Sequence, residues 1–177
     1  TPVIFGFIIA LLIQGQLLYI TTNADSLRLI ASGLAIGLGS IGPTLGLAFL
    51  AQQSCQSIGQ HRTAYAKILY FTIGSAALIE SAIIFCFIIA FMLLNRTIPL
   101  NSSLDRGLIY IFAAIAMALG NLGVGISSGT LSAKSCKIFA QKPELYGLIA
   151  KTSYFSQVFI ETCSIYTFII SLGLIFL

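Results

Sequence analysis

The chain has 177 residues, of which 58% are hydrophobic and only 8% are charged, and its mean hydropathy is +1.01. These values exclude a water-soluble globular domain and predict a membrane protein. The net charge of +4 comes from nine basic and five acidic residues. The basic residues are too dispersed to form the continuous phosphate track that nucleic-acid binding requires.

Five apolar stretches are long enough to cross a bilayer as helices, which takes about 20 residues each. They cover residues 2–21, 27–58, 64–94, 107–139 and 145–177. Because the stretches are continuously apolar and do not alternate with polar residues, they predict helices and not the strands of a β-barrel. The expected fold class is an all-α membrane protein with five transmembrane helices.

The first stretch, VIFGFIIALLIQGQLLYI, has the apolar core that a signal peptide shares with a permanent helix. A basic leader does not precede it in the given sequence, and Thr21-Thr22-Asn23 is a weak cleavage site. We therefore expect the helix to be retained as an extra transmembrane segment over residues 1–22. Its place inside or outside an assembly stays open.

The basic residues predict an orientation in the membrane. Most of them lie at or near two polar connections, and these are Arg62, Lys67, Lys134, Lys137, Lys142 and Lys151. The positive-inside rule places the connections at 59–67 and 134–151 in the cytoplasm. Five spans then place the C-terminus outside. We expect an integral protein of a bacterial inner membrane, with an organellar membrane as the alternative.

A shift of 81 positions aligns the chain with itself. It pairs Glu80 with Glu161 and Ser81 with Thr162, and the match extends to Phe85 with Tyr166, Gln60 with Gln141, Tyr65 with Tyr146, and Ser54-Cys55 with Ser135-Cys136. Such self-similarity indicates an internal repeat. We predict two helical hairpins, at residues 24–95 and 104–177, preceded by one helix without a counterpart.

The two helices of each hairpin differ in character. The first carries small residues, including Gly33-x-x-x-Gly37 and Gly42-x-x-x-Gly46, which allow helix backbones to approach closely in lipid. Pro43 interrupts this helix in the first hairpin and is expected to bend it. The second helix of each hairpin is bulky and carries the glutamate.

Both glutamates are expected near the middle of the bilayer. Glu80 follows His61 by 19 residues and Glu161 follows Pro143 by 18, which corresponds to about 28 Å of helix beyond each turn. An ionised carboxylate at this depth costs at least a few kcal/mol, so each acid should be protonated or neutralised by a bound cation. This behaviour suits an ion carrier, although a buried acid can also serve only to hold helices together.

The glycine-rich helix GLAIGLGSIGPTLGLAFLA, the polar loops GQHR and AQKPE, and the acids within IES and IET together resemble the proteolipid c subunit family of rotary ATP synthases and ATPases. The resemblance covers both hairpins but not the N-terminal helix. It implies a ring of copies with glycine-rich helices inside and acid-bearing helices outside. It also implies a stator subunit that supplies an arginine, central stalk subunits, and surrounding membrane lipids as partners.

The resemblance assigns the polar loops to stalk contacts. The residues concerned are Gln60, His61, Arg62, Gln141, Lys142 and Pro143. The family's usual pattern there is Arg-Gln-Pro, whereas glutamine stands at both arginine positions and only the second loop keeps its proline. The chain would be a non-catalytic, ion-translocating subunit without a cofactor, because no nucleophile and base pair, metal cluster or phosphate loop is evident in the sequence.

The transported ion is either a proton or sodium. In sodium-binding members of the family the acid is followed by Ser or Thr, a Tyr lies five positions after it, and the inner helix supplies a Gln. Glu161, Thr162 and Tyr166 fit the first two conditions, and Gln157 could add an amide. The inner-helix positions hold Leu47 and Ser128, and near Glu80 and Ser81 the Tyr is replaced by Phe85. The pattern favours protons, with the Glu161 site the better suited of the two to sodium.

Two other functions stay open at this stage. A small secondary transporter or ion channel could bind its substrate between two parallel repeats near the bilayer midplane. An accessory assembly protein would need no ion pathway, and replacing each Glu by Gln would then leave transport intact.

Overall fold

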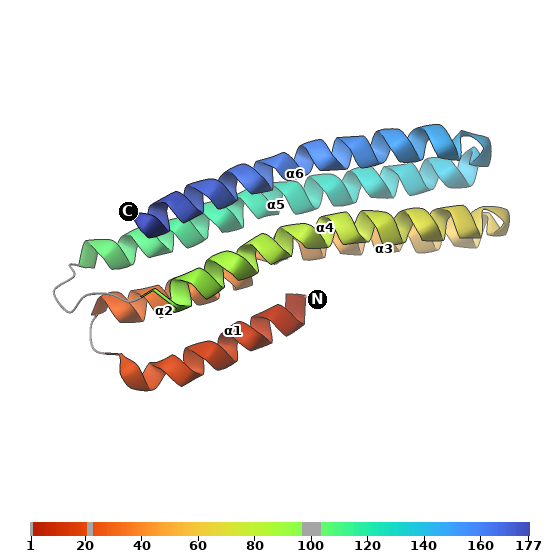
Figure 1. Cartoon of the computed structure of the whole chain (residues 1–177). Helices are drawn as coiled ribbons and strands as arrows, with labels where there is room; N and C mark the ends of the chain where they lie inside the picture. Colours follow the sequence, from red (N-terminus) through yellow and green to blue (C-terminus); the bar gives the residue numbers. More distant parts are fainter. Residues whose placement is uncertain (1, 21–22, 97–103) are drawn as a thin grey trace.

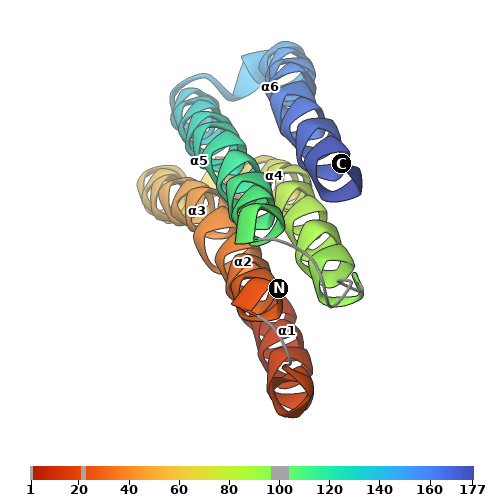
Figure 2. The ribbon, with the colours of Figure 1, turned by 90° about the vertical axis from the view of Figure 1, so that its left-hand side faces the viewer.

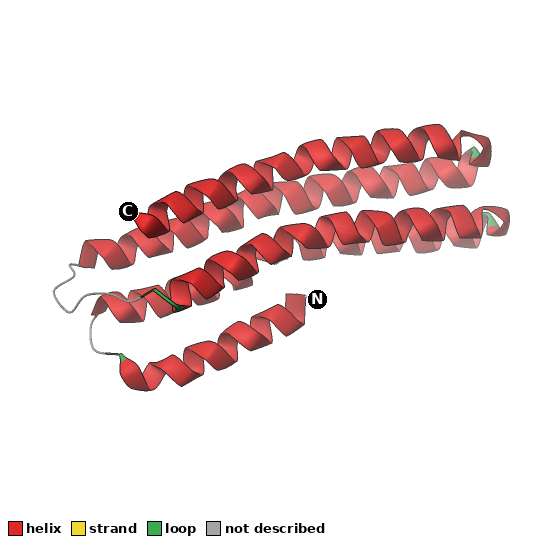
Figure 3. Ribbon diagram, viewed as in Figure 1, coloured by secondary structure: helices red, strands yellow, loops and turns green. Residues whose placement is uncertain are grey.

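The computed structural model describes residues 2–20, 23–96 and 104–177. Within these residues the chain is helical and contains no strand (Figure 3), which confirms the all-α fold class. The α-helices are α1 (Pro2–Gln16), α2 (Asn23–Gly39), α3 (Ile41–Gln60), α4 (Tyr65–Leu94), α5 (Leu104–Gln141) and α6 (Tyr146–Phe176). Short 3₁₀ helices at Leu17–Tyr19 (η1), Arg62–Ala64 (η2) and Pro143–Leu145 (η3) connect them.

Four segments of the described chain are long and apolar enough to cross a membrane. They are Asn23–Gln60, Arg62–Leu94, Asp105–Gln141 and Pro143–Phe176. The predicted N-terminal span is shorter than expected, since α1 has only 15 residues and thus measures about 22 Å, less than the bilayer core of about 30 Å. Its predicted end at Thr22 lies outside the described residues.

The first glycine-rich helix is interrupted near Pro43. The helix divides into α2 and α3 at Ser40, three residues before Pro43. Proline has no N–H to donate to the carbonyl of Gly39, so one hydrogen bond of the helix is lost at this point. The counterpart in the second hairpin is Val124, and α5 continues unbroken through it.

The helices form two layers, as Figures 1 and 2 show. The combined helix α2–α3 packs along α5, and α4 packs against both of them. Helix α6 packs against α5 and α4, while α1 packs against α2 and α4. The glycine-rich helices therefore lie side by side in one layer, and the acid-bearing helices lie in the other.

Helices α3 and α5 touch through their glycines. A side chain at Gly46 would collide with the backbone of Gly125, and one at Gly125 would collide with the backbone of Gly42 and Pro43. This interlocking explains why small residues recur along both helices, because only glycine permits backbones to approach so closely.

The two hairpin turns have the same backbone conformation. His61 has φ −138° and ψ 86°, and Lys142 at the equivalent position has φ −136° and ψ 75°. Each residue donates its backbone N–H to the carbonyl four residues earlier, Ser57 or Ile138. Both turns lie at the same end of the bundle (Figure 1), so the sequence repeat is also a repeat in space.

Candidate ion-binding site

Glu80 and Glu161 occupy equivalent places in the two hairpins. Each lies at the middle of its helix, Glu80 in α4 with 30 residues and Glu161 in α6 with 31. Both side chains are partly buried. Helices of this length place their centres near the middle of the hydrocarbon layer.

Glu161 is hydrogen bonded across the boundary between the hairpins. The Ser81 hydroxyl donates to Glu161 Oε1 at 2.8 Å. The same hydroxyl lies 2.7 Å from the carbonyl oxygen of Leu78, one turn earlier in its own helix. The acid of the second hairpin thus meets the hydroxyl that directly follows the acid of the first.

Thr162 has the same local geometry as Ser81 but a different environment. Its hydroxyl donates to the carbonyl of Phe159 at 2.7 Å, which matches the bond from Ser81 to Leu78. Within the described residues, Thr162 bonds to neither glutamate, and the Glu80 carboxyl has no hydrogen bond or ion pair. One chain therefore brings together Glu161 and Ser81, but leaves Glu80 without a corresponding hydroxyl.

Tyr166 and Gln157 do not bond to Glu161. The Tyr166 side chain is 64% exposed at the surface of the chain. Gln157 is fully buried, and its Nε2 donates to Ser75 Oγ at 3.2 Å and to Ser153 Oγ at 3.4 Å. Gln157 therefore links α6 to α4, one turn from the acid.

Asn121 is a buried polar residue that sequence analysis missed. It lies on α5, and its Nδ2 donates to the Ala82 carbonyl at 2.6 Å and to Cys86 Sγ at 2.9 Å, both on α4. Its Oδ1 accepts a hydrogen bond from Ser164 on α6. This amide joins three helices close to Ser81 and Glu161, and the signal that could have revealed it is an amide inside the apolar run ALGNLGVG.

Hydroxyl pairs join the inner and outer helix of each hairpin. Ser54 and Thr72 are 2.8 Å apart in the first hairpin, and Ser135 donates to Ser153 at 3.1 Å in the second. The pairs are related by the shift of 81 positions. They fix each acid-bearing helix to its glycine-rich partner on the turn side of the glutamates.

The predicted stalk-contact residues are grouped at one end of the bundle. Those on the turns are Gln60, His61, Arg62, Gln141, Lys142 and Pro143, and all are exposed except Pro143, which is partly exposed. Lys67 at the start of α4 donates to the carbonyl of Pro143 at 3.0 Å. The two turns are thus joined into one polar surface.

The site consists of carboxyl and hydroxyl groups held among apolar helices. Among the described residues, there is no cluster of three or more His, Cys, Asp or Glu side chains that could hold a metal ion. A carboxyl group in such surroundings is stable when it is neutral and becomes ionised only where water or a positive charge reaches it. This chemistry suits the binding and release of a cation.

Comparison with known proteins gives the same result for both hairpins. The sequence model of the family described as the C subunit of ATP synthase matches residues 30–93 and again residues 111–174. The ATP synthase c subunit of Dehalococcoides mccartyi is 39% identical over 72 residues, which cover 41% of this chain and 95% of that protein.

Two further relatives are also about one hairpin long. The chloroplastic ATP synthase c subunit of Euglena gracilis is 39% identical over 64 residues, or 36% of this chain and 79% of that protein. The ATP synthase c subunit of Chloroflexus aurantiacus is 32% identical over 69 residues, or 39% of this chain and 91% of that protein. Because the family model matches twice and covers most of the sequence, the chain belongs to the c-subunit family of ATP synthases as a tandem duplication.

Proposed function

We propose that this chain is a subunit of the rotor ring of a rotary ATP synthase or ATPase. In this role Glu80 and Glu161 each carry one proton across the membrane, and ATP is made or hydrolysed on other subunits. Membership of the c-subunit family supports the role, and the bond between Glu161 and Ser81 is the observation that carries the mechanism.

The Ser81 hydroxyl has one hydrogen but two acceptors within reach, 2.8 Å and 2.7 Å away. If Glu161 is ionised, the hydroxyl can satisfy only one of them at a time. If Glu161 is protonated, its O–H can donate to Ser81 Oγ while Ser81 donates to Leu78, so both contacts are hydrogen bonds. Ser81 can therefore partner Glu161 in both states, by donating to the carboxylate and by accepting from the neutral carboxyl, while the surrounding lipid favours the neutral, loaded state.

The exposed small residues support a ring of copies. Gly42 and Gly46 make the backbone contact between α3 and α5, and their equivalents, Gly123 and Ser127, are exposed on α5. Thr44 and Ala48, the equivalents of Gly125 and Gly129, are both accessible on α3. The exposed face of α5 thus matches one side of the contact between α3 and α5, and the exposed face of α3 matches the other side. In a ring, the exposed face of α5 in one copy would pack against the exposed face of α3 in the next.

The same repeat completes the Glu80 site. Within one chain, the acid of the second hairpin meets the hydroxyl of the first. Carried around a ring, this relation brings the acid of the first hairpin, Glu80, to Thr162 of a neighbouring copy. Each chain would then contribute two sites, one internal and one shared.

Protons suit this site better than sodium. A sodium ion requires several oxygen ligands, as hard cations generally do, whereas a proton requires the carboxyl and one partner. Around Glu161 the described partner is the Ser81 hydroxyl, while Thr162 bonds to its own helix and Tyr166 is largely exposed. Sodium transport would therefore need ligands that a neighbouring copy supplies.

The proposed orientation places both hairpin turns in the cytoplasm, where basic residues are favoured, and the C-terminus outside. The joined turns would contact the foot of the central stalk. Release of the proton would take place beside a stator subunit whose arginine stabilises the carboxylate.

ATP-driven proton pumping by the assembled complex tests the proposal. Replacing Glu161 by Gln, or Glu80 by Gln, keeps the shape of the side chain but prevents its ionisation, so each variant should lose pumping while the ring still assembles. Pumping at the wild-type rate in both variants would instead favour an accessory protein with no ion pathway.

A further inference from the structure

We propose that α6 of a second copy docks on a surface of the first hairpin. Helix α1 covers the half of this surface that lies away from the hairpin turns, and it leaves this half when the copy binds. The proposal rests on the rotor-ring function given above. It identifies an interaction surface, the groove between α2 and α4 on the side away from α5 and α6, and commits to a second copy of this chain as its partner.

Helix α1 lies in this groove and runs in the same direction as α4. Phe5 packs against Phe87 with ring centroids 4.8 Å apart, and Gln16 Nε2 donates to the carbonyl of Leu94 at 3.1 Å. Later residues of α1 therefore contact later residues of α4, so the two helices are parallel. Figures 1 and 2 show α1 on the side of the first hairpin opposite α5 and α6.

The groove is the place where the repeat would seat a neighbour. Within the chain, α4 of the first hairpin contacts both helices of the second, α5 and α6. In a ring, the second hairpin of the preceding copy would stand to this chain's first hairpin as the first hairpin stands to the second. Its α6 would therefore contact the inner helix α2–α3 and the outer helix α4 of this chain. Helix α1 contacts these same two elements, α2 and α4.

One aromatic pair shows the overlap at single residues. Phe85 on α4 packs against Phe168 on α6 with ring centroids 5.2 Å apart. In the repeat, Phe85 corresponds to Tyr166, and Phe168 corresponds to Phe87. The equivalent pair between two copies is therefore Tyr166 of the preceding copy and Phe87 of this chain. Tyr166 is 64% exposed and so is free to pack, but Phe87 already packs against Phe5. Phe5 thus takes the place that the repeat gives to Tyr166 of a second copy.

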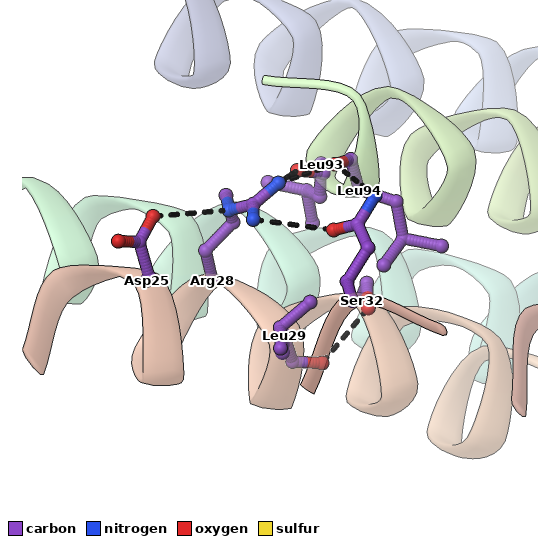
Figure 4. Close-up of polar contacts among 7 residues, drawn as sticks. Asp25, Arg28, Leu29, Ser32, Leu93 and Leu94 are labelled. Atoms are coloured by element: carbon purple, nitrogen blue, oxygen red, sulfur yellow. Dashed lines mark hydrogen bonds and ion pairs between the residues drawn. The ribbon is translucent and has the colours of Figure 1, made fainter. Parts of the chain in front are cut away.

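Hydrogen bonds hold the C-terminal end of helix α1, and Ile9 in its middle is buried in the hydrophobic core. Arg28 on α2 donates to Gln16 Oε1 at 3.2 Å and to the carbonyls of Leu93 and Leu94, which end α4 (Figure 4). Between α1 and α2 lies an apolar pocket of about 460 Å³, and its lining includes Ile13 and Gly33. Part of the contact between α1 and α2 is therefore left unfilled.

The turn-proximal half of the same surface is uncovered by the described residues. Tyr70 is 71% exposed and Ile73 is 60% exposed, both on α4. Ile73 is the repeat equivalent of Tyr154, whose ring packs against Phe71. A second copy can therefore dock first in this half of the groove and then displace α1 from the other half.

A disulfide lock tests the competition. The native cysteines Cys55, Cys86, Cys136 and Cys163 are unpaired and are replaced by alanine, after which Phe5→Cys and Phe87→Cys tie α1 to α4. A matched control with Phe85→Cys and Phe168→Cys ties the two hairpins together without covering the groove. Ring formation from purified chains is then measured by native mass spectrometry, with and without reductant.

The oxidised lock should reduce the yield of rings by about tenfold, reductant should restore it, and the control lock should have no effect. Equal yields from the oxidised and reduced lock would overturn the displacement of α1 while leaving the ring intact. If the wild-type chain itself forms no ring, the rotor function fails, and this inference fails with it.

A second comparison needs no cysteine. Phe5→Ala removes the side chain that contacts Phe87, whereas Phe7→Ala removes one from the exposed face of α1, where Phe7 is 63% exposed. The first variant should form rings several-fold faster than wild type, and the second should match wild type. An unchanged or slower rate for Phe5→Ala would contradict the proposal even if the cysteine variants fold poorly.

Discussion

Ser81 on α4 donates a hydrogen bond to Glu161 on α6 at 2.8 Å, although the two residues belong to different repeats. The bond means that the carboxyl proposed to bind the ion in one hairpin depends on the other hairpin for a polar partner. In a protein of one hairpin this relation could form only between separate chains. In this duplicated chain, one of the two proposed sites is built into the monomer.

Replacing Ser81 by alanine should weaken the Glu161 site. Loss of the hydroxyl removes one hydrogen bond, with a net value of about 1 kcal/mol, and leaves the carboxyl without its described partner. Since this donated hydrogen bond stabilises the carboxylate, more Glu161 should then be protonated and react with a carbodiimide at a fixed pH, both in the isolated chain and in the ring.

Thr162→Ala provides the matched comparison. Because Thr162 bonds only to its own helix in the described chain, the isolated chain should show wild-type labelling at both acids. In the ring, more Glu80 should be labelled, because its carboxylate loses the hydroxyl of the neighbouring copy. A rise at Glu161 in place of Glu80 would show that the shared site is assembled differently.

Replacing Gly46 by alanine should destabilise the chain by about 1–3 kcal/mol, as overpacking generally does. The added methyl group would collide with the backbone of Gly125, and a backbone cannot rotate away as a side chain can. Gly37→Ala is the control, because a side chain there meets nothing within 4 Å. Unfolding in mixed detergent should separate the two variants, and equal stabilities would contradict the close contact of α3 with α5.

Asn121→Leu should destabilise the bundle by about 1–3 kcal/mol, because the buried amide bonds to α4 and α6 and its loss leaves the Ser164 hydroxyl unpaired. Ser40→Ala at the repeat-equivalent position should change stability by less than about 0.5 kcal/mol. The Ser40 hydroxyl bonds only to the carbonyl of Gly37 in its own helix. The same unfolding assay measures both, and a neutral Asn121→Leu would show that the three-helix link is not stabilising.

Arg28→Met should destabilise the end of the first hairpin away from its turn by about 1–2 kcal/mol. The guanidinium bonds to two carbonyls at the end of α4 and lies 3.8 Å from Asp25, and a cation at a helix C-terminus is favourable. Hydrogen exchange should rise at Leu93 and Leu94 in this variant. Exchange at the other end of α4, near Ile68, should stay the same, and uniform exchange at both ends would rule out a local role.

The helices and the repeat could be predicted from sequence because each depends on local pattern. The stretch predicted at 64–94 forms α4 at Tyr65–Leu94, and that at 145–177 forms α6 at Tyr146–Phe176. Polar residues end the apolar runs where the chain must turn, so the boundaries follow from composition. The interruption near Pro43 was predictable for the same reason, since proline acts on its own helix.

The contacts between hairpins could not be predicted in this way. The bond from Ser81 to Glu161 depends on how α4 and α6 are rotated about their axes, and the Asn121 link depends on three helices at once. Gln157 was predicted as a possible ligand, but it is directed to Ser75 across the helix interface. The position of α1 was equally open, because an apolar helix carries little information about which groove it will fill.

The central claim is that both mid-membrane glutamates take up and release a cation, and carbodiimide labelling of the assembled complex tests it most directly. The reagent reacts with protonated carboxyl groups, so Glu80 and Glu161 should both be modified, labelling should fall as the pH rises, and ATP-driven pumping should stop in parallel. Sodium should give no protection at constant pH if protons are the transported ion. Full pumping activity after both glutamates have been modified would contradict the account.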